Sequence, residues 1–357
     1  MNKRKRRLFF HPFVIRLLHW EFWSFGMVYC WLYPVWFYYC LKARSLFFFN
    51  ASNPAIKNGG FLAESKKDIH AIAPDKLMPP TCFFPATSSF DEVKNSLLQA
   101  GFDYPLIGKP DIGGRGRGVK KLQHDADLEH YVQTVPFDFH IQKFIDLPRE
   151  AGIFYYRLPG EPHGHITGIV EKEFLTVTGN GRDTIGELLL QDKRYVLQYP
   201  VLSAQLGDRI HEIPQNGSSQ ILVPYGNHAR GAKFTDQSDC IDEALTRTID
   251  EACQQIDQFY FGRLDIRYKS WDLLRQGKDF CIIEINGAGS EPTHIYDPKH
   301  SIFFAWREII RHWELLYRVS IINHQRGHRY LTFSEGIQMF REDREQSRQL
   351  NRLSEQL

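Results

Sequence analysis

The chain has 357 residues, of which 24% are charged and 43% hydrophobic, so it is long enough for one large domain or two ordinary ones and is no peptide-scale scaffold. The net charge is +2, and the basic cluster lies at the extreme N-terminus, which argues against nucleic-acid binding. Six cysteines without CxxC or Cys/His spacing argue against a zinc site or a disulfide framework and indicate reduced thiols in a cytoplasmic protein.

The first sixty residues are unusually aromatic and basic. Residues 22–41 carry no charge, half of them are Trp, Tyr or Phe, and as a helix they would reach about 30 Å, the thickness of a bilayer core. Aromatic rings favour the headgroup region and Pro34 would kink a helix, so the pattern predicts an in-plane or re-entrant anchor. Basic residues on both sides place it on the cytoplasmic face. The alternative is an aromatic segment that folds onto the body of the protein.

After a boundary near residue 60, hydrophobic periodicity predicts alternating helices and strands, which is an α/β arrangement. Helices are expected at 62–72, 89–100, 125–133, 184–191, 239–259, 302–323 and 334–353. Strands are expected at 104–109, 119–122, 140–145, 152–158, 165–177, 262–268 and 280–285. We predict an N-terminal segment at 1–60, a catalytic domain at 61–330 with lobes at about 75–145 and 146–330, and a polar C-terminal helix at 331–357.

A glycine-rich loop follows the strand that ends in Lys109. Its glycines are Gly113, Gly114, Gly116 and Gly118. Such a loop can bring backbone N–H groups close to phosphates while a nearby lysine supplies positive charge. Taken alone, the same pattern fits a flexible hairpin equally well.

Two later strands carry polar side chains at a spacing of two residues. Arg263 and Asp265 share one strand face, as do Glu284 and Asn286, and pairing of the strands would bring all four together. Two carboxylates and an amide oxygen suit Mg²⁺, and an arginine can stabilise a transferring phosphoryl group. Surface salt bridges are the alternative, but an unpaired carboxylate inside the apolar run CIIEIN would be costly.

With these motifs in order, residues 62–311 resemble the ATP-grasp superfamily, most closely its D-alanine:D-alanine ligase and cyanophycin synthetase branches. The resemblance implies two α+β lobes that hold ATP between them. It assigns Lys66 and Lys109 to the ATP phosphates and the loop 113–118, including Arg115, to their cover. It also implies Mg²⁺, with Mn²⁺ as the alternative, bound by Asp265, Glu284 and Asn286, and makes Arg263 the catalytic arginine.

The same resemblance assigns the adenine and substrate regions. The segment HIQKFI resembles the hinge that meets adenine, which places Gln142, Lys143, Phe144 and Ile145 there, with backbone groups offered by Lys143 and Ile145. Glu150 is expected at the ribose hydroxyls. The stretch FLTVTGNGRDTIGELL is similar to a cyanophycin synthetase pattern in which Asn180 replaces the usual acid. In the loop PYGNHARGAKF, His228, Arg230 and Lys233 are candidates for binding substrate or the acyl phosphate, with a plain surface loop as the alternative.

The resemblance implies an ADP-forming ligase that activates a carboxylate as an acyl phosphate and transfers the acyl group to an amine. The alternatives are a kinase on the same scaffold and a non-catalytic ATP-binding membrane scaffold. Only about sixty residues precede the first lobe, and the D-alanine ligase substrate motif is absent. The expected partners are small carboxylate and amine substrates, free or lipid-linked, a membrane surface and a second copy in a homodimer.

Overall fold

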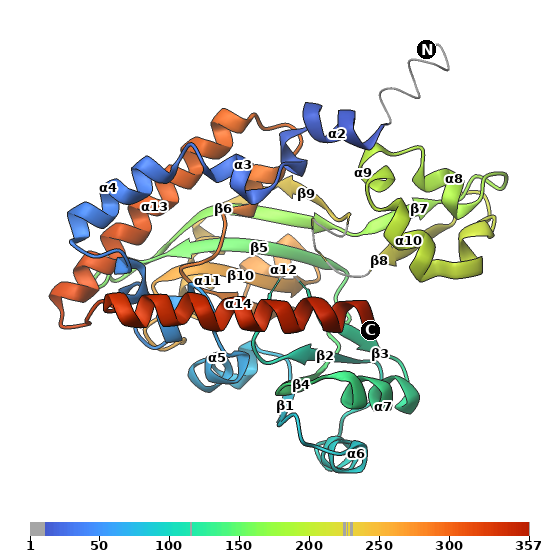
Figure 1. The fold of residues 1–357 in the computed structure, drawn as a ribbon, viewed down its shortest axis with the longest axis horizontal. Coiled ribbons are helices and arrows are strands. Elements are labelled where there is room, and N and C mark those ends of the chain that lie inside the picture. Colours follow the sequence, from blue (N-terminus) through green and yellow to red (C-terminus); the bar gives the residue numbers. More distant parts are fainter. Residues whose placement is uncertain (1–10, 115, 224–225, 227, 229–230, 357) are drawn as a thin grey trace. The chain divides into compact units, whose positions relative to one another are not determined.

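The computed structural model describes residues 11–356, apart from Arg115 and positions 224–225, 227 and 229–230 (Figure 1). The chain forms two compact units. The small unit comprises Met1–Tyr33, Val170–Gln237 and Thr293–Glu308, and the large unit comprises Pro34–Ile169, Ser238–Pro292 and Ile309–Leu357. The predicted domain and lobe boundaries stay predictions.

One sheet of the large unit is four-stranded, with the order β1-β4-β2-β3 and antiparallel neighbours. Its strands are β1 (Thr81–Phe84), β2 (Leu106–Pro110), β3 (Lys120–Leu122) and β4 (Phe139–Lys143). Helices α6 (Phe90–Gln99) and α7 (Asp125–Thr134) share a buried core with it, in which Val93, Leu97 and Tyr131 pack with Phe139. Ser89 begins α6 through a capping box with Glu92.

The other sheet is five-stranded, with the order β11-β10-β5-β6-β9. Its strands in the large unit are β5 (Arg149–Tyr156), β10 (Phe261–Tyr268) and β11 (Phe280–Asn286). β6 (His165–Glu173) continues into the small unit, where its last residues pair with β9 (Lys233–Asp236). The amphipathic helix α11 (Glu243–Gln254) buries Leu245 and Ile249 in one core with Leu264 of β10. That packing fixes the middle of the sheet.

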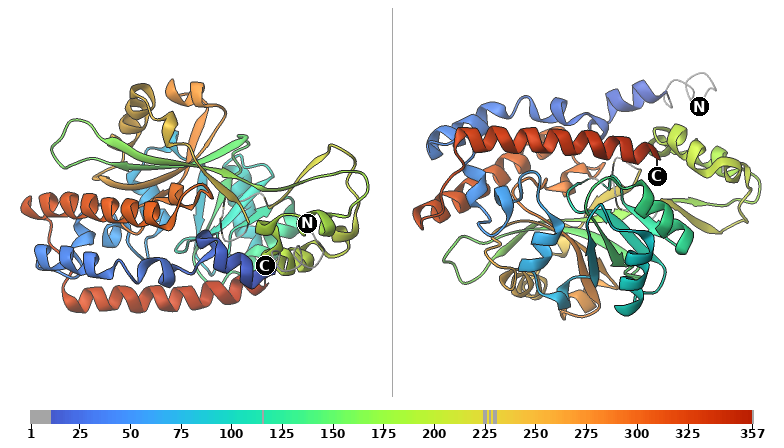
Figure 2. Two further views of the ribbon diagram at one scale, coloured as in Figure 1. Left: turned by 90° about the horizontal axis from the view of Figure 1, so that it is seen from above. Right: turned by 60° about the horizontal axis from the view of Figure 1, so that its bottom comes forward.

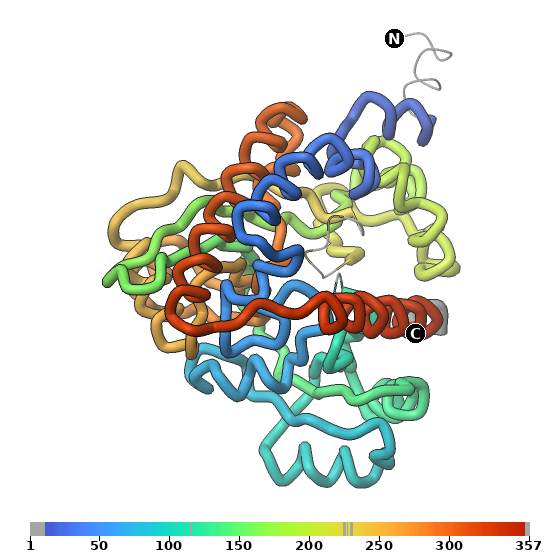
Figure 3. Tube along the Cα trace, turned by 60° about the vertical axis from the view of Figure 1, so that its left-hand side comes forward, coloured from blue at the N-terminus to red at the C-terminus, as the bar shows by residue number. Residues whose placement is uncertain are grey.

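Much of the aromatic N-terminal segment lies inside the large unit. Helix α4 (Tyr33–Ala43) runs beside α13 (Ile302–Gln325) (Figure 3). The rings of Trp36 and Trp313 are 5.1 Å apart. Phe47, Phe48 and Phe49 are buried in the same core, which also takes in Met339 of the polar helix α14 (Phe333–Gln356). These residues therefore fold onto the body of the protein, as the alternative prediction states. Among the described residues no helix is long and apolar enough to cross a membrane.

The small unit holds a two-stranded sheet and short helices (Figure 2). Strands β7 (Leu175–Thr178) and β8 (Ser219–Val223) pair next to α8 (Ile185–Leu189), α9 (Lys193–Val196) and α10 (Tyr199–Leu206). The N-terminal helices of this unit are α2 (Pro12–Leu18) and α3 (Phe25–Tyr29). Two further helices, α5 (Lys66–Ile72) and α12 (Trp271–Arg275), belong to the large unit.

The predicted α+β class is confirmed, and most elements lie within a few residues of their predicted ranges. Three predictions were wrong in detail. The single strand expected at 165–177 is two strands, β6 and β7, separated at Phe174. The helix expected at 239–259 begins only at Glu243, because Asp242 caps it by accepting a hydrogen bond from Leu245 N at 2.8 Å. The helix expected at 62–72 begins at Lys66 for the same reason, with Ser65 as its cap.

Candidate active site in the large unit

The two polar strand motifs are direct neighbours. Strands β10 and β11 are antiparallel, with Asp265 opposite Glu284 and Arg263 opposite Asn286. The pairing expected from the period of two is therefore present. A register shift follows Asp265, so the regular ladder is interrupted beside this carboxylate.

Arg263 and Asp265 form a buried two-pronged ion pair. Arg263 Nε donates to Asp265 Oδ1 at 2.8 Å and Nη2 donates to Oδ2 at 3.2 Å. The remaining Nη1 donates to the backbone oxygen of Glu291 at 3.3 Å. Burial alone would lower the pKa of Arg263, but the attraction of Asp265, with a further contribution from Glu284, raises it. The guanidinium is thus a fixed positive charge at this site.

The predicted metal ligands can be tested against their present partners. The described residues hold no group of three or more His, Cys, Asp or Glu side chains that could bind a metal ion, and the predicted set has an amide as its third ligand. The Asn286 side-chain nitrogen is buried and, within the described chain, has no hydrogen-bond partner. A flip of this amide would exchange its nitrogen and oxygen, and the nitrogen would lose no hydrogen bond by it. Glu284 and Asn286 therefore fit a hard cation, whereas Asp265 would have to be shared with Arg263.

Lys109 links the two sheets of the large unit. Its ammonium donates to Gln142 Oε1 of β4 at 2.8 Å and to the backbone oxygen of Ile283 of β11 at 3.4 Å. Burial lowers the pKa of Lys109 to about 8, against an opposing attraction from Glu284. Because burial disfavours the charged form of this lysine, phosphate oxygens placed beside it would stabilise its ammonium group.

Lys66 lies against the glycine loop. Its ammonium donates to the backbone oxygen of Gly113 at 2.7 Å and to that of Asp111 at 3.3 Å. Gly116 and Gly118 have φ of +68°, a left-handed conformation that other residues rarely adopt. The loop therefore needs these two glycines. Arg115 lies outside the described residues.

Helix α14 packs on the same loop. A Cβ atom on Gly113 would meet Leu350 at 3.0 Å, and one on Gly118 would meet Leu353 at 3.0 Å. Arg117 donates to Asn351 Oδ1 at 3.2 Å, and Gln346 donates to the backbone oxygen of Ile112 at 3.3 Å. The loop expected to cover the phosphates is thus held by the C-terminal helix in this structure.

The expected adenine hinge is partly engaged by the protein itself. The Gln142 side chain accepts from Lys109 and donates to Thr81 Oγ1 at 3.1 Å. The backbone N–H of Lys143 already donates to Pro80 O at 3.0 Å, so this N–H is not available to adenine. Phe144 takes Lys121 Nζ over its ring at 3.9 Å, and Ile145 follows the end of β4. None of these contacts assigns the segment to adenine, which stays a prediction.

Glu150 is buried and paired with Arg267, at 3.2 Å between Oε2 and Nε. Arg267 was not among the predicted site residues. It stands two residues after Asp265 on the same strand face, so the period of two that selected Arg263 and Asp265 could have found it. The expected role of Glu150 at ribose would require it to be shared with this arginine.

A backbone clamp holds the ends of β10 and β11. The N–H groups of Ala288 and Gly289 donate to Gly59 O at 2.9 Å and Gly60 O at 2.8 Å. A Cβ atom on Gly287 would stand 2.4 Å from Gly59 O, so the close approach requires a glycine there. The buried Asn53 amide donates to Gly59 O and to Phe261 O, at 2.9 and 2.8 Å. The segment before Lys66 thus supports the strands that carry the site.

Glu64 is a further acid that sequence reasoning missed. Burial raises its pKa to about 7; Lys66 opposes the shift and Glu284 adds to it. The position of Glu64 two residues before Lys66 does not by itself indicate a functional acid. Its interaction with Glu284 depends on the backbone clamp that holds the two segments together. Shifted acids of this kind gather at functional sites.

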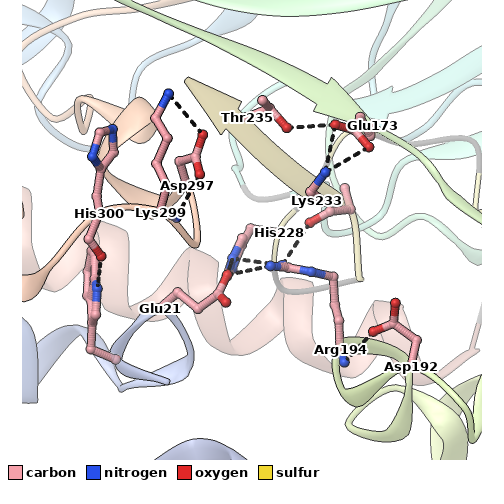
Figure 4. Close-up of polar contacts among 12 residues, drawn as sticks. Glu21, Glu173, Asp192, Arg194, His228, Lys233, Thr235, Asp297, Lys299 and His300 are labelled. Carbon is pink, nitrogen blue, oxygen red and sulfur yellow. Dashed lines mark hydrogen bonds and ion pairs between the residues drawn. The ribbon is translucent and has the colours of Figure 1, made fainter. Parts of the chain in front are cut away.

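The third predicted group lies in the small unit (Figure 4). His228 Nε2 is 3.3 Å from Glu21 Oε2 and 3.1 Å from Arg194 Nη1, and its ring packs between Phe22 and Tyr296. Lys233 Nζ donates to both oxygens of Glu173, at 3.0 and 3.2 Å. Arg230 lies outside the described residues. The roles of these three in catalysis or binding stay predictions.

The structure is similar to solved structures of three ligases. Bifunctional glutathione synthetase from Pasteurella multocida matches 67% of this chain and 33% of its own, at 14% identity and a TM-score of 0.37. VanG D-Ala:D-Ser ligase from Enterococcus faecalis matches 71% and 61%, at 18% identity and 0.37. D-alanine–D-alanine ligase from Bacillus anthracis matches 74% and 69%, at 12% identity and 0.40.

The chain thus spans a third of the length of the first match and about three fifths of the second. No protein-family model and no curated protein matches the sequence. The resemblance stated from the motifs includes D-alanine:D-alanine ligase, and one of these structures is such a ligase.

Proposed function

We propose that the protein is an ADP-forming ligase of the ATP-grasp type that joins a carboxylate to an amine. The observation that carries this proposal is the convergence around Glu284. Its charge acts on Lys109, Arg263 and Glu64, which come from three separate segments of the large unit. Half-buried cations of two kinds, hard oxygen ligands and a glycine loop on Lys66 are the groups that phosphoryl transfer from ATP requires.

In the first step a substrate carboxylate oxygen attacks the γ-phosphorus of ATP. The bond to the β-phosphate oxygen breaks, and ADP and an acyl phosphate form. Lys109 and Lys66 place positive charge where the phosphate oxygens gain negative charge. A lysine whose pKa burial holds at about 8 gains the most from such a partner.

In the second step the amine nitrogen attacks the acyl carbon, phosphate leaves, and the nitrogen loses a proton to solvent. Arg263 is held by Asp265 with its guanidinium fixed, and it stabilises the negative charge on the tetrahedral oxygen. Amide formation needs no covalent nucleophile from the protein.

Mg²⁺ would be held by Glu284 and Asn286, with Asp265 shared between the ion and Arg263. A divalent ion at this position supplies charge neutralisation for the phosphates. The fit rests on the buried, unpartnered Asn286 amide nitrogen and on two carboxylates from neighbouring strands. Mn²⁺ has the same ligand preference and is the alternative.

Two other functions use the same groups. A kinase would transfer the phosphoryl group to a hydroxyl and release no free phosphate. A membrane scaffold would bind ATP without turnover, and the retention of Arg263 beside both predicted carboxylate ligands favours chemistry over this alternative.

The test is release of ADP and phosphate by purified protein with Mg²⁺ and ATP, screened against pooled carboxylates and amines. The ligase releases phosphate only when an acid and an amine are both present, and Glu284→Gln abolishes the release. Glu314→Gln, a substitution at an exposed position of helix α13, is the matched control and leaves the rate unchanged. ADP formation without free phosphate would support the kinase, and ATP binding without turnover in every pool would support the scaffold.

A further inference from the structure

Helix α14 is polar along most of its length, but one narrow stripe of it is buried. Met339, Gln346, Leu350 and Leu353 follow the spacing of three, four or seven residues that places side chains on one face of a helix. The three apolar members are no more than 2% exposed. Met339 lies in the core that the aromatic N-terminal segment shares, and Leu353 lies in the core of the four-stranded sheet. Within the large unit the helix thus joins two cores, and its C-terminal end lies beside β2 and β3 (Figure 1).

The end of this stripe lies against both ends of the glycine loop. Leu350 packs on Gly113, where a Cβ atom would stand 3.0 Å from the leucine side chain. Leu353 packs on Gly118 at the same spacing of 3.0 Å. A Cβ atom on Gly114, by contrast, would meet nothing within 4 Å in the part of the chain that the structure describes. The helix therefore restrains the two ends of the loop and leaves room at Gly114.

Arg117 adds polar contacts between the loop and the helix. Its Nη1 donates to Asn351 Oδ1 at 3.2 Å and its Nη2 donates to Ser347 Oγ at 3.4 Å. Its Nε donates to the backbone oxygen of Gly114, within the loop, at 3.4 Å. Arginine can make all three contacts because its donors diverge from one rigid plane. One guanidinium thus holds a carbonyl of the loop and two side chains of α14 together.

The loop is also held from the side of α5. Lys66 donates to Gly113 O at 2.7 Å, and an antiparallel bridge pairs Ser65 with Ile112. A loop that closes on a ligand loses conformational entropy, and a loop that is already ordered loses less and binds more tightly. Restraint of the loop by α5 and α14 therefore lowers the entropic cost of binding for any ligand that the loop covers.

We propose that the last turns of α14 position the glycine loop for the phosphates of ATP, with Leu350 and Arg117 as the positioning residues. The proposal rests on the proposed ligase function and extends it to the C-terminal helix. Both residues act through the backbone of the loop, whose N–H groups they hold in place, and not on the reacting atoms. Weaker contacts with α14 therefore lower the affinity for ATP and leave the chemical step unchanged.

The first measurement is hydrogen exchange of the loop amides in the purified full chain. Leu350→Ala opens a gap over Gly113, so we expect the amides of residues 112–119 to exchange about tenfold faster, while β11 exchanges as in the parent. Leu98→Ala, which truncates an exposed leucine of α6, is the matched control and leaves the loop unchanged. Equal exchange of the loop in Leu350→Ala and in the parent would overturn the proposal.

The second measurement is ATP binding and steady-state kinetics of the variants. We expect Leu350→Ala and Arg117→Gln to raise the Kd and the KM for ATP by about tenfold, with kcat within about twofold of the parent. Asn351→Ala lowers the affinity in the same direction, whereas Asn351→Asp keeps an oxygen that accepts from Arg117 and restores it. The matched control for Arg117→Gln is Arg344→Gln, at an exposed position of α14.

The outcomes separate the role of α14 from the proposed function. A parent protein that binds and turns over ATP, with variants of unchanged ATP affinity, would overturn the role of α14 alone. Tighter ATP binding by the variants would also overturn it, because the helix would then oppose the position that the loop takes over the phosphates. A parent that binds no ATP would overturn the proposed function and the positioning role together, and hydrogen exchange would still show whether α14 orders the loop.

Discussion

Two pairs of an arginine with a buried carboxylate, Arg194 with Glu21 in the small unit and Arg263 with Asp265 in the large unit, differ in their surroundings. Arg194 and Glu21 in the small unit are joined by His228 and by the face of Phe22, 5.2 Å from the guanidinium. Arg194 also donates to Ala232 O at 3.4 Å. This pair is enclosed by partners that satisfy it.

Arg263 and Asp265 in the large unit lie near one buried donor without a partner among the described residues and near two groups whose charged form is disfavoured by burial. The side-chain nitrogen of Asn286, opposite Arg263, is buried and, within the described chain, has no hydrogen-bond partner. Burial lowers the pKa of Lys109 to about 8 and raises that of Glu64 to about 7. Charged groups in such a condition lower the stability of the free protein unless a ligand supplies their partners. The comparison indicates that a buried ion pair does not mark a site, whereas the unsatisfied groups around it do.

The largest expected effect is on catalysis at Lys109. Lys109→Met removes a cation from the ATP phosphates, so we expect turnover to fall by about 10²–10³-fold. The measurement is ADP release at saturating ATP. Lys67→Met removes an exposed lysine next to Lys66 and serves as the control. Equal turnover of the two variants would contradict a role of Lys109 at the ATP phosphates, and with it the assignment of the active site to the surroundings of Arg263 and Asp265.

The pair in the small unit should respond in stability. Glu21→Ala leaves Arg194 buried without its carboxylate, at a cost of about 3–5 kcal/mol in the free energy of unfolding. Because the pair lowers the pKa of Glu21 below 4.5, its contribution is present above that pH and is lost as pH falls through the folded-state pKa. Urea unfolding at several pH values measures both effects. Glu342→Ala breaks an exposed pair with Lys57 and should cause a much smaller loss.

The clamp at the end of β11 gives the next prediction. Gly287→Ala places a Cβ atom 2.4 Å from Gly59 O, so we expect a loss of about 1–3 kcal/mol in unfolding free energy. Gly26→Ala, at a helix position with nothing within 4 Å, is the matched control and should not destabilise. Equal stability of the two variants would show that the clamp yields without cost.

The last prediction concerns how the stability of the protein depends on pH through Glu64. Its pKa is about 7 in the folded protein against 4.5 as the usual value, so its ionisation destabilises the free protein as pH rises from 4.5 to 7. Glu64→Gln removes this cost. The melting temperature of the variant minus that of the parent should therefore increase across this interval and stay level above it. A difference independent of pH would contradict the raised pKa.

Local patterns predicted much of this structure from the sequence. The period of two placed Arg263 with Asp265, and Glu284 with Asn286, on shared strand faces, and hydrophobic periodicity gave the start of the helix at Phe90 to within one residue. The four-residue strand β1 escaped because a run so short, between prolines, has no measurable period.

Contacts between distant segments could not be predicted. Glu21 and Arg194 are 173 positions apart, and nothing in the sequence around either residue names the other. The same holds for Glu64, whose neighbour Glu284 comes from a strand more than two hundred residues away. One sequence shows which residues share a strand face, but not which segments meet across the fold.

The hydrogen bonds of Asn53 limit how far this protein can be truncated from its N-terminus. Its side chain also accepts from Tyr260 N at 2.8 Å and Phe261 N at 3.0 Å, so one residue satisfies the backbone where β10 begins. A truncated chain that starts after Phe61 would lack Asn53. The N–H groups of Tyr260 and Phe261 would then lose their hydrogen-bond acceptor at the start of β10, the strand that carries Arg263. To improve solubility during purification, exposed apolar side chains of α4 such as Phe37 and Leu41 should be replaced, and the N-terminal segment should be kept.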